Sequence, residues 1–138
     1  MSSEIVGYDS AAVRWELRAL SVLRFMSGLL VLQHGTAKVL DFPYIEKMAN
    51  VVPTSTGGIA GFLELFGGAL LAVGLFTRPT AFVMSGLMAA AYFIAHAKRS
   101  FFPIINEGEL AVLYCFVFLF LAFAGGGPWS VDALRRNR

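Results

Sequence analysis

Four long, continuous apolar stretches dominate the chain and leave it few ways to fold. They cover about residues 17–40, 58–76, 79–97 and 109–125. A helix that crosses a bilayer needs roughly 20 residues, and the stretches reach or approach that length. Apolar and polar residues do not alternate along them as they do in the strands of an outer-membrane barrel. Because backbone groups in lipid must be paired locally, the stretches predict transmembrane helices.

The composition fits the same environment. Hydrophobic residues make up 57% of the chain and charged residues only 14%, whereas soluble domains carry about a quarter charged residues. The net charge of +2 is too weak for a nucleic-acid partner, so none is expected. The single cysteine, Cys115, excludes an internal disulfide and a cysteine-only metal site. We therefore expect an all-α protein with no metal and no intrinsic cofactor. One domain over residues 1–138 would form a four-helix bundle in the lipid bilayer.

Several residues at the ends of the stretches are typical of helix boundaries. Thr54, Ser55 and Thr56 precede the second stretch and can cap it. Pro79 is tolerated in the first turn of the third stretch. Asn106 followed by Glu109 resembles a capping box at the start of the fourth.

The distribution of basic residues predicts the orientation of the chain. The two termini and the turn between the second and third stretches share one side, and the other two connections share the opposite side. The first side carries Arg14, Arg18, Arg78, Arg135, Arg136 and Arg138, and the second carries Lys38, Lys47, Lys98 and Arg99. The excess predicts a multi-pass protein of the cell inner (plasma) membrane with the N and C termini in the cytoplasm.

Ionisable residues inside these stretches are the candidates for function, since a charge at bilayer depth costs several kcal/mol. Glu64 lies in the second stretch and His34 lies at a similar depth in the first. His96, Asn106, Glu107 and Glu109 fall on the same side of the membrane. Small residues around Glu64 (Gly57, Gly61, Gly68 and Ala72) would let a neighbouring helix approach closely. The pattern predicts a polar pocket that opens towards the non-cytoplasmic side.

Each of these residues also has a purely structural explanation. Glu64 could form a buried ion pair with His34 or Lys38, and His34 could simply bind a backbone carbonyl. Lys38 could snorkel to the interface, His96 could be interfacial, and Glu109 could be a helix cap. Arg24 lies deep in the first stretch, where no acidic residue matches its depth. It could snorkel towards the cytoplasm or pair with a partner subunit.

Three segments of the chain resemble the DoxX family of small four-helix membrane proteins. The segments are residues 23–38, ending in His34-Gly35-Thr36-Ala37-Lys38; residues 64–79, with Glu64-Leu65-Phe66-Gly67-Gly68 and Thr77-Arg78-Pro79; and residues 106–111 with 125–132. The resemblance implies a four-helix fold in a bacterial-type cytoplasmic membrane. It carries over Arg24, His34, Lys38, Glu64, Arg78, Asn106, Glu109 and Asp132 as motif residues. Glu107 stands where the family often has glycine.

The resemblance implies redox-linked functions, since relatives include a subunit of a thiosulfate:quinone oxidoreductase. The leading hypothesis is therefore a subunit of a redox complex that binds a membrane quinone in the polar pocket. Its electrons would come from a partner protein. Glu64 and His34 are the candidate catalytic residues. The candidate cofactor-binding residues are His34, Lys38, Glu64, His96, Asn106 and Glu109.

Two other functions remain open from the sequence. The first is an accessory or scaffolding subunit, partnered by other proteins or by copies of itself. An aromatic face of the fourth stretch (Phe116, Phe118, Phe120 and Phe123) would then meet partner helices. The second, a small-solute transporter, is less favoured because the chain shows neither an inverted repeat nor broken helices.

Overall fold

The computed structural model describes residues 10–136 as an all-helical chain without a β-strand in that range. The elements in order are α1 (Ser10–Val39), α2 (Thr56–Val73), α3 (Thr77–Ala91), the π-helical turn η1 (Tyr92–His96), α4 (Pro103–Asn106), α5 (Glu109–Ala124) and α6 (Val131–Arg136). The predicted all-α class is confirmed, and the four long helices match the four apolar stretches. Arg138, which was counted for the orientation, lies outside the described residues.

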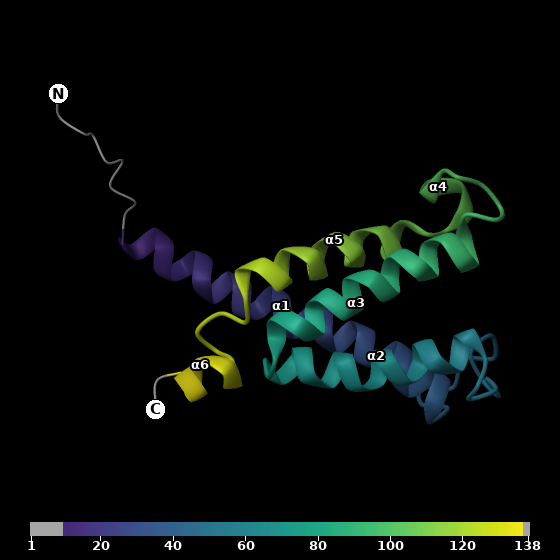
Figure 1. Ribbon diagram of the computed structural model, residues 1–138, viewed down its shortest axis with the longest axis horizontal. Coiled ribbons are helices and arrows are strands. Elements are labelled where there is room, and N and C mark those ends of the chain that lie inside the picture. The colour runs from purple at the N-terminus through teal and green to yellow at the C-terminus, as the bar shows by residue number, and fades with distance from the viewer. Residues whose placement is uncertain (1–9, 137–138) are drawn as a thin grey trace.

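Two of the described helical segments are long and apolar enough to cross a membrane by length and composition. They are Thr56–Val73 and Thr77–His96, the latter being α3 continued by η1. The apolar helix α5 is shorter, at 16 residues. Helix α1 has 30 residues and begins at Ser10, well before the predicted start near residue 17, so its first turns lie beyond the other helices (Figure 1).

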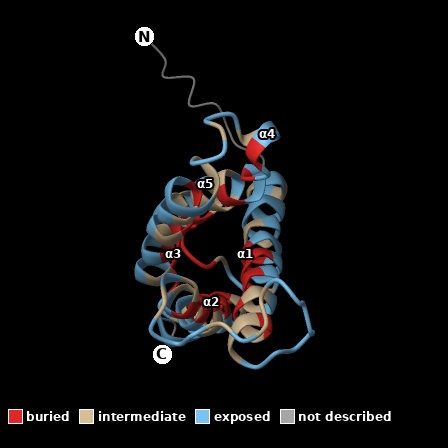
Figure 2. Cartoon of the chain, turned by 90° about the vertical axis from the view of Figure 1, so that its right-hand side faces the viewer, coloured by how far each residue is buried: buried red, intermediate tan, exposed pale blue. Residues whose placement is uncertain are grey.

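The long helices pack as two pairs. Helix α1 runs along α2, and α3 runs along α5, while the tight α2–α3 turn joins the pairs (Figure 1). Seen from the end, the buried faces of these helices point into a shared interior (Figure 2). Leu71, Phe118 and Leu121 are fully buried there, with Val31 and Met84 almost so. The prediction that Phe118 faces partners was therefore wrong, because a residue two positions from Phe116 and Phe120 points to the other side of the helix.

Glycines bring the α1–α2 pair into backbone contact. A Cβ atom added to Gly28 would lie 2.6 Å from the backbone nitrogen of Ala72, and one added to Gly68 would lie 2.6 Å from that of Leu32. A Cβ atom on Gly35 would overlap the backbone of Leu65. The predicted close approach at the glycine pattern of the second stretch is confirmed. Close backbone packing of this kind drives helix association where lipid removes the hydrophobic effect.

The predicted caps have different outcomes. Ser55 caps α2, since its Oγ accepts a hydrogen bond from the Gly58 N–H at 3.1 Å, as expected. The capping box at Asn106 was wrong, because Asn106 ends the short helix α4 and the N-cap of α5 is Gly108. The Asn106 Oδ1 atom instead accepts from the Gly108 N–H at 2.8 Å, across a left-handed Glu107 with a φ of 60°.

The glycine contacts predict a difference between two alanine substitutions. Gly68→Ala places its methyl group against the α1 backbone and should lower the free energy of unfolding by about 1–3 kcal/mol. Gly86→Ala is the matched control, because no atom lies within 4 Å of its added Cβ atom. It should leave stability unchanged or raise it by up to about 1 kcal/mol. Thermal unfolding in detergent measures both, and equal melting temperatures would contradict the close α1–α2 packing.

Candidate functional site

A buried ion pair joins α1 to α2. The Lys38 Nζ atom lies 2.9 Å from Oε1 and 2.7 Å from Oε2 of Glu64. The side chain of Glu64 is 8% exposed and that of Lys38 is 18% exposed. Gly61 makes room for the lysine stem, since a Cβ atom there would lie 2.9 Å from the Lys38 Cβ atom. The predicted ion pair between Glu64 and Lys38 is confirmed. The ammonium of Lys38 donates to both oxygens of the carboxylate.

His34 lies one helical turn before Lys38 on α1. Its side chain is half-buried, and it makes no hydrogen bond within residues 10–136. The expected carbonyl partner is therefore absent from the described part of the chain. Both nitrogens of the imidazole are left available to a ligand or to water.

A second polar group gathers at the end of α3, around the fully buried side chain of Asn106. The Nδ2 group of Asn106 donates to the carbonyl of Ser100 at 2.7 Å and to the hydroxyl of Tyr92 at 3.3 Å. The Tyr92 hydroxyl donates in turn to the carbonyl of Phe101. The Nδ1 atom of His96 lies 3.0 Å from the carbonyl oxygen of Asn106. The group therefore fixes the loop between α3 and α5.

The π-helical turn η1 positions this group. It places Tyr92 and His96 at its two ends and closes with a hydrogen bond from the Ala97 N–H to the Tyr92 carbonyl at 2.8 Å. Gly108 leaves room for the Tyr92 ring, since a Cβ atom there would lie 2.8 Å from the ring. Single π-turns within α-helices occur frequently at functional sites. Apolar helix patterns carry no signal for such a turn, so the sequence did not predict it.

An apolar cavity of about 420 Å³ lies between α3 and α5 beside this polar group. It is lined by Met88, Ala89, Tyr92, Phe93, Phe101, Pro103, Val112, Cys115 and Phe116, and no polar atom contributes surface to it. Phe93, Phe101 and Phe116 are 62%, 72% and 64% exposed, so the cavity opens onto the outer surface of the helix pair. Its lining therefore suits an apolar occupant.

The predicted site residues fall into two groups. Lys38 and Glu64 lie between α1 and α2, whereas His96 and Asn106 lie at the α3–α5 end. No hydrogen bond or ion pair among residues 10–136 connects the groups. Glu109 begins α5, is exposed, and makes neither kind of contact in that range. A single pocket containing all six predicted residues stays a prediction.

Sequence analysis missed the role of Arg24. Its side chain is buried, at 2% exposure, and neither snorkels nor awaits a partner subunit. The guanidinium donates to the carbonyls of Leu71 at 2.5 Å, Ala72 at 2.6 Å, Trp129 at 2.6 Å and Gly126 at 2.8 Å. The last carbonyls of a helix lack partners inside it and carry negative partial charge. Two sequence features could have indicated these carbonyl acceptors. They are the C-terminal end of the second apolar stretch and the glycine run 125–127 after the fourth.

Asp132 holds the C-terminal segment against the start of α3. Its Oδ1 and Oδ2 atoms accept hydrogen bonds from the backbone N–H groups of Phe76 and Thr77, both at 2.8 Å. Burial raises the pKa of Asp132, but the hydrogen bonds from Thr77 and Phe76 and the charge of Arg135 outweigh it, so that the pKa lies below its ordinary value. The Thr77 hydroxyl contributes to this lowering, although it does not reach hydrogen-bond geometry.

Comparison with known proteins finds a matching family model and a similar protein. The model of the DoxX family matches residues 19–97, more than half of the chain. An uncharacterized protein of Haemophilus influenzae is 43% identical over 117 residues, which cover 82% of this chain and 87% of that protein. No solved structure matches the chain. The DoxX family is membrane-associated, in agreement with the apolar helices.

The capping role of Asp132 predicts a pH-dependent stability. Because its folded-state pKa is depressed, the stabilisation is present above the unfolded pKa of about 3.9 and is lost as pH falls through the folded-state pKa. Asp132→Asn should therefore be less stable than wild type at pH 7, by about 1 kcal/mol. The two melting temperatures should converge below about pH 4. A difference that is constant from pH 3 to pH 7 would contradict the capping role.

The ion pair predicts a recoverable loss of stability. Glu64→Gln leaves the Lys38 ammonium without its counterion and should destabilise the protein by about 3 kcal/mol or more. The double variant Lys38→Met with Glu64→Gln removes the orphaned charge and should recover much of that loss. Thermal unfolding of the wild type, both single variants and the double variant completes the cycle. Strictly additive losses would mean that the two groups do not interact.

Proposed function

The chain belongs to the DoxX family, and on this premise we propose that it is a multi-pass inner-membrane subunit of a redox-linked complex that binds a membrane quinone. In this proposal α1, α2, α3 with η1, and α5 each cross the bilayer, and both termini lie in the cytoplasm. Electrons would come from a partner protein, because residues 10–136 hold no redox group that we identify.

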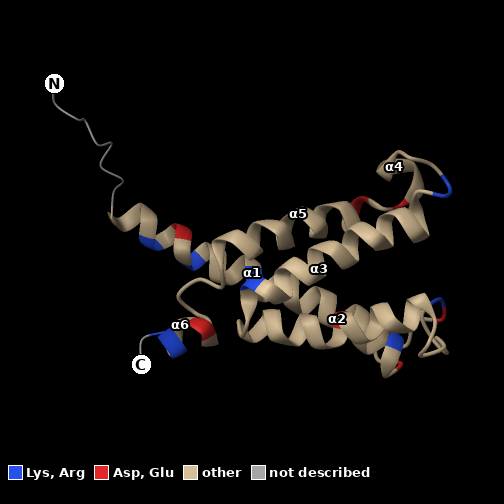
Figure 3. Cartoon of the chain, in the orientation of Figure 1, with Lys and Arg blue, Asp and Glu red and all other residues tan. Residues whose placement is uncertain are grey.

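The distribution of charge supports the crossing. The middle of α3 and of α5 is bare of acidic and basic residues (Figure 3), and the charged residues in the middle of the other two long helices, Arg24 of α1 and Glu64 of α2, are buried. At about 1.5 Å per residue, α2 and the segment from α3 through η1 measure about 27 and 30 Å, close to the hydrocarbon thickness. Helix α5 would measure about 24 Å, which a bilayer accommodates by thinning or by adjustment of flanking residues.

The observation that carries the quinone proposal is the apolar cavity between α3 and α5. A quinone reaches its site from within the bilayer, and this cavity opens on the outer face of the helix pair. Its aromatic lining suits a flat ring, since stacked or edge-to-face contacts stabilise aromatic pairs. The cavity volume of about 420 Å³ falls within the range of ordinary small-molecule sites, about 300–1,000 Å³. The lining therefore fits such a ring.

The residues around the cavity would divide the work. Phe93 and Phe116 would exclude water and hold the ring faces, while Asn106 fixes the orientation of Tyr92. His96 lies outside the lining, and its Nδ1 atom faces the Asn106 carbonyl, so Nδ1 carries the proton and Nε2 of the neutral ring would accept a hydrogen bond, as from a hydroxyl of the reduced quinol. A bound quinone supplies two-electron, two-proton redox chemistry.

His34 and Glu64 are the residues that we propose for proton handling. His34 has no protein partner in the described range, and Glu64 keeps its proton-binding oxygens at Lys38. Glu109, at the start of α5, lies at the exposed edge of the same helix pair as His96 and would act there only as a polar rim.

Two substitutions on neighbouring residues test the cavity. Ala89→Phe fills it, whereas Ala90→Phe adds the same ring to an exposed position outside the lining. Calorimetric titration of purified protein with a short-chain ubiquinone analogue should show at least tenfold weaker binding for Ala89→Phe. Ala90→Phe should bind like the wild type. Equal affinity in all three proteins would exclude this cavity as the quinone site.

The proton-handling residues need a separate comparison. His34→Ala and the stability-restored double variant Lys38→Met with Glu64→Gln should bind the analogue with unchanged affinity and lose turnover in the assembled complex. Loss of binding in these two variants, with Ala89→Phe unaffected, would move the quinone to the α1–α2 pair.

An accessory role is the second proposal, and the exposed face of α5 favours it. Phe116, Phe120 and Phe123 are exposed and recur at helical spacing on one side of the helix. Mild-detergent purification separates the two functions. A stoichiometric partner together with no quinone binding by the complex would favour scaffolding.

A further inference from the structure

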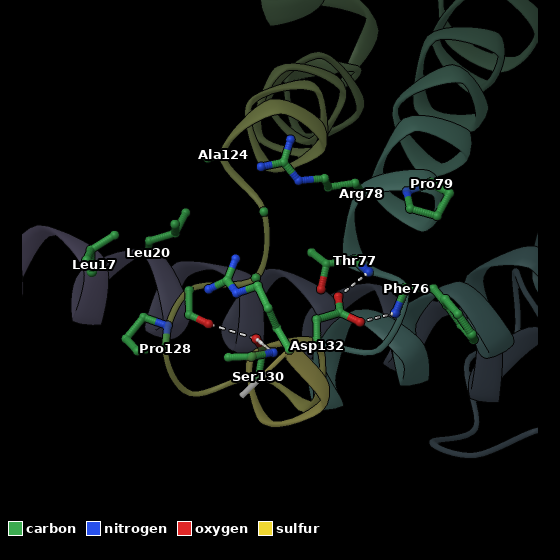
Figure 4. Close-up of a pocket in the computed structure, with 15 residues that line it drawn as sticks. Leu17, Leu20, Phe76, Thr77, Arg78, Pro79, Ala124, Pro128, Ser130 and Asp132 are labelled. Carbon is green, nitrogen blue, oxygen red and sulfur yellow. Dashed lines mark hydrogen bonds between the residues drawn. The ribbon is translucent and has the colours of Figure 1, made fainter. Parts of the chain in front are cut away.

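A second large cavity lies at the opposite end of the bundle from Tyr92 and Asn106. It measures about 530 Å³ and lies between the start of α3, the end of α5 and the segment that runs from Gly125 into α6 (Figure 4). Leu17 and Leu20 of α1 form its far side. None of the residues proposed for quinone binding lines it.

Two arginines line this cavity without a protein acceptor. Arg78 and Arg136 are exposed and make no hydrogen bond or ion pair within residues 10–136. Three other arginines among the described residues of this part of the molecule are engaged. Arg24 binds carbonyls, Arg18 stacks on Trp15, and Arg135 stacks on Phe76. The acid in the lining, Asp132, already accepts two backbone hydrogen bonds. The cavity therefore presents a net positive charge.

Gly125, Gly127 and Thr77 complete the wall beside the two arginines. The backbone of Gly125 and Gly127 takes positive φ values of 86° and 74° and carries no side chain. The side chain of Thr77 is fully buried in the wall, and its hydroxyl lies beside the Asp132 carboxylate without hydrogen-bond geometry (Figure 4). Figure 4 shows Thr77 and Arg78 together on one side of the cavity, with Arg78 extended towards Ala124.

The remaining lining is apolar, and the surroundings resemble a membrane interface. Leu17, Leu20 and Pro128 give the cavity an apolar side next to its basic side. Trp15 and Trp129 are 65% and 59% exposed nearby, and tryptophan is enriched where a membrane meets water. A ligand that fits would join a negative head to an apolar body.

We propose that this cavity binds the phosphate headgroup of an anionic phospholipid from the leaflet on the side of the termini. Arg78 and Arg136 present planar guanidinium forks, which bind phosphate oxygens in a bidentate manner. The acyl chains follow the apolar side past Leu17 and Leu20. Basic pockets beside transmembrane helices on the cytoplasmic side bind such headgroups. The inference rests on the proposed membrane crossing and is independent of quinone binding.

Lipid binding to the full-length protein tests the proposal. The protein is released from nanodiscs that contain equal amounts of phosphatidylglycerol and phosphatidylcholine, and native mass spectrometry counts the retained lipids. Wild type should retain phosphatidylglycerol preferentially. The double variant Arg78→Gln with Arg136→Gln should lose that preference by roughly tenfold or more. Arg14→Gln is the matched control, since Arg14 is an exposed arginine of α1 outside the lining, and it should behave like the wild type.

Two further measurements separate the possible outcomes. Millimolar glycerol phosphate should not displace the retained lipid, whereas displacement would identify a soluble phosphate compound as the ligand and overturn the lipid assignment. An equal preference in the double variant and in Arg14→Gln would overturn the site itself. The double variant should bind the quinone analogue normally, while Ala89→Phe should keep its lipid preference. Failure of one proposal is therefore distinguishable from failure of the other.

Discussion

One end of the molecule is held together by the hydrogen bonds that the guanidinium of Arg24 donates. Arg24 is buried in α1, yet its acceptors belong to the end of α2 and to the chain that follows α5. No carboxylate contacts it in the described residues. Carbonyl dipoles stabilise the charge instead, and those at the end of a helix are well suited because they lack intrahelical partners. Gly74 permits the arrangement, since a Cβ atom there would lie 2.9 Å from the Arg24 Cζ atom.

The placement of the C-terminal segment follows from this contact. Arg24 fixes the carbonyls of Gly126 and Trp129, and the chain then turns into α6 with Asp132 facing the start of α3. The N–H of Asp132 donates to the carbonyl of Gly74 at 2.9 Å, so the α2–α3 turn is held from both sides. The hydrogen bonds that keep α1, α2 and α3 in register also position the segment that lines the cavity of Arg78 and Arg136. Stability and the proposed lipid site thus share a framework but use different arginines.

The sequence predicted more of the fold than of the site. Apolar stretches located the four long helices, and the glycine pattern around Glu64 indicated the close α1–α2 contact, because both follow from local rules of composition and spacing. Partners across the bundle were harder to assign. The match for Arg24 was sought among acidic side chains, whereas its acceptors are backbone carbonyls that every residue carries. Likewise the π-turn at Tyr92 leaves no compositional trace, and Phe118 was misplaced because the whole of α5 is apolar.

The two ends of the bundle differ in how their cations are paired. At the end with Lys38, Glu64 pairs with Lys38 in the α1–α2 interface and Glu107 pairs with Arg99, while Lys47 and Lys98 form no ion pair within residues 10–136. At the other end Arg78 and Arg136 keep free guanidinium groups beside a cavity, although an acid lies in the same lining. Counting basic residues alone gives only a modest excess on the side of the termini. Among residues 10–136, Arg14, Arg78 and Arg136 have no internal partner at this end and Lys47 and Lys98 have none at the other, so the excess keeps its direction. Only an unpaired cation remains available to the negative surface of a cytoplasmic leaflet. The same physical argument therefore supports both the orientation and the lipid site.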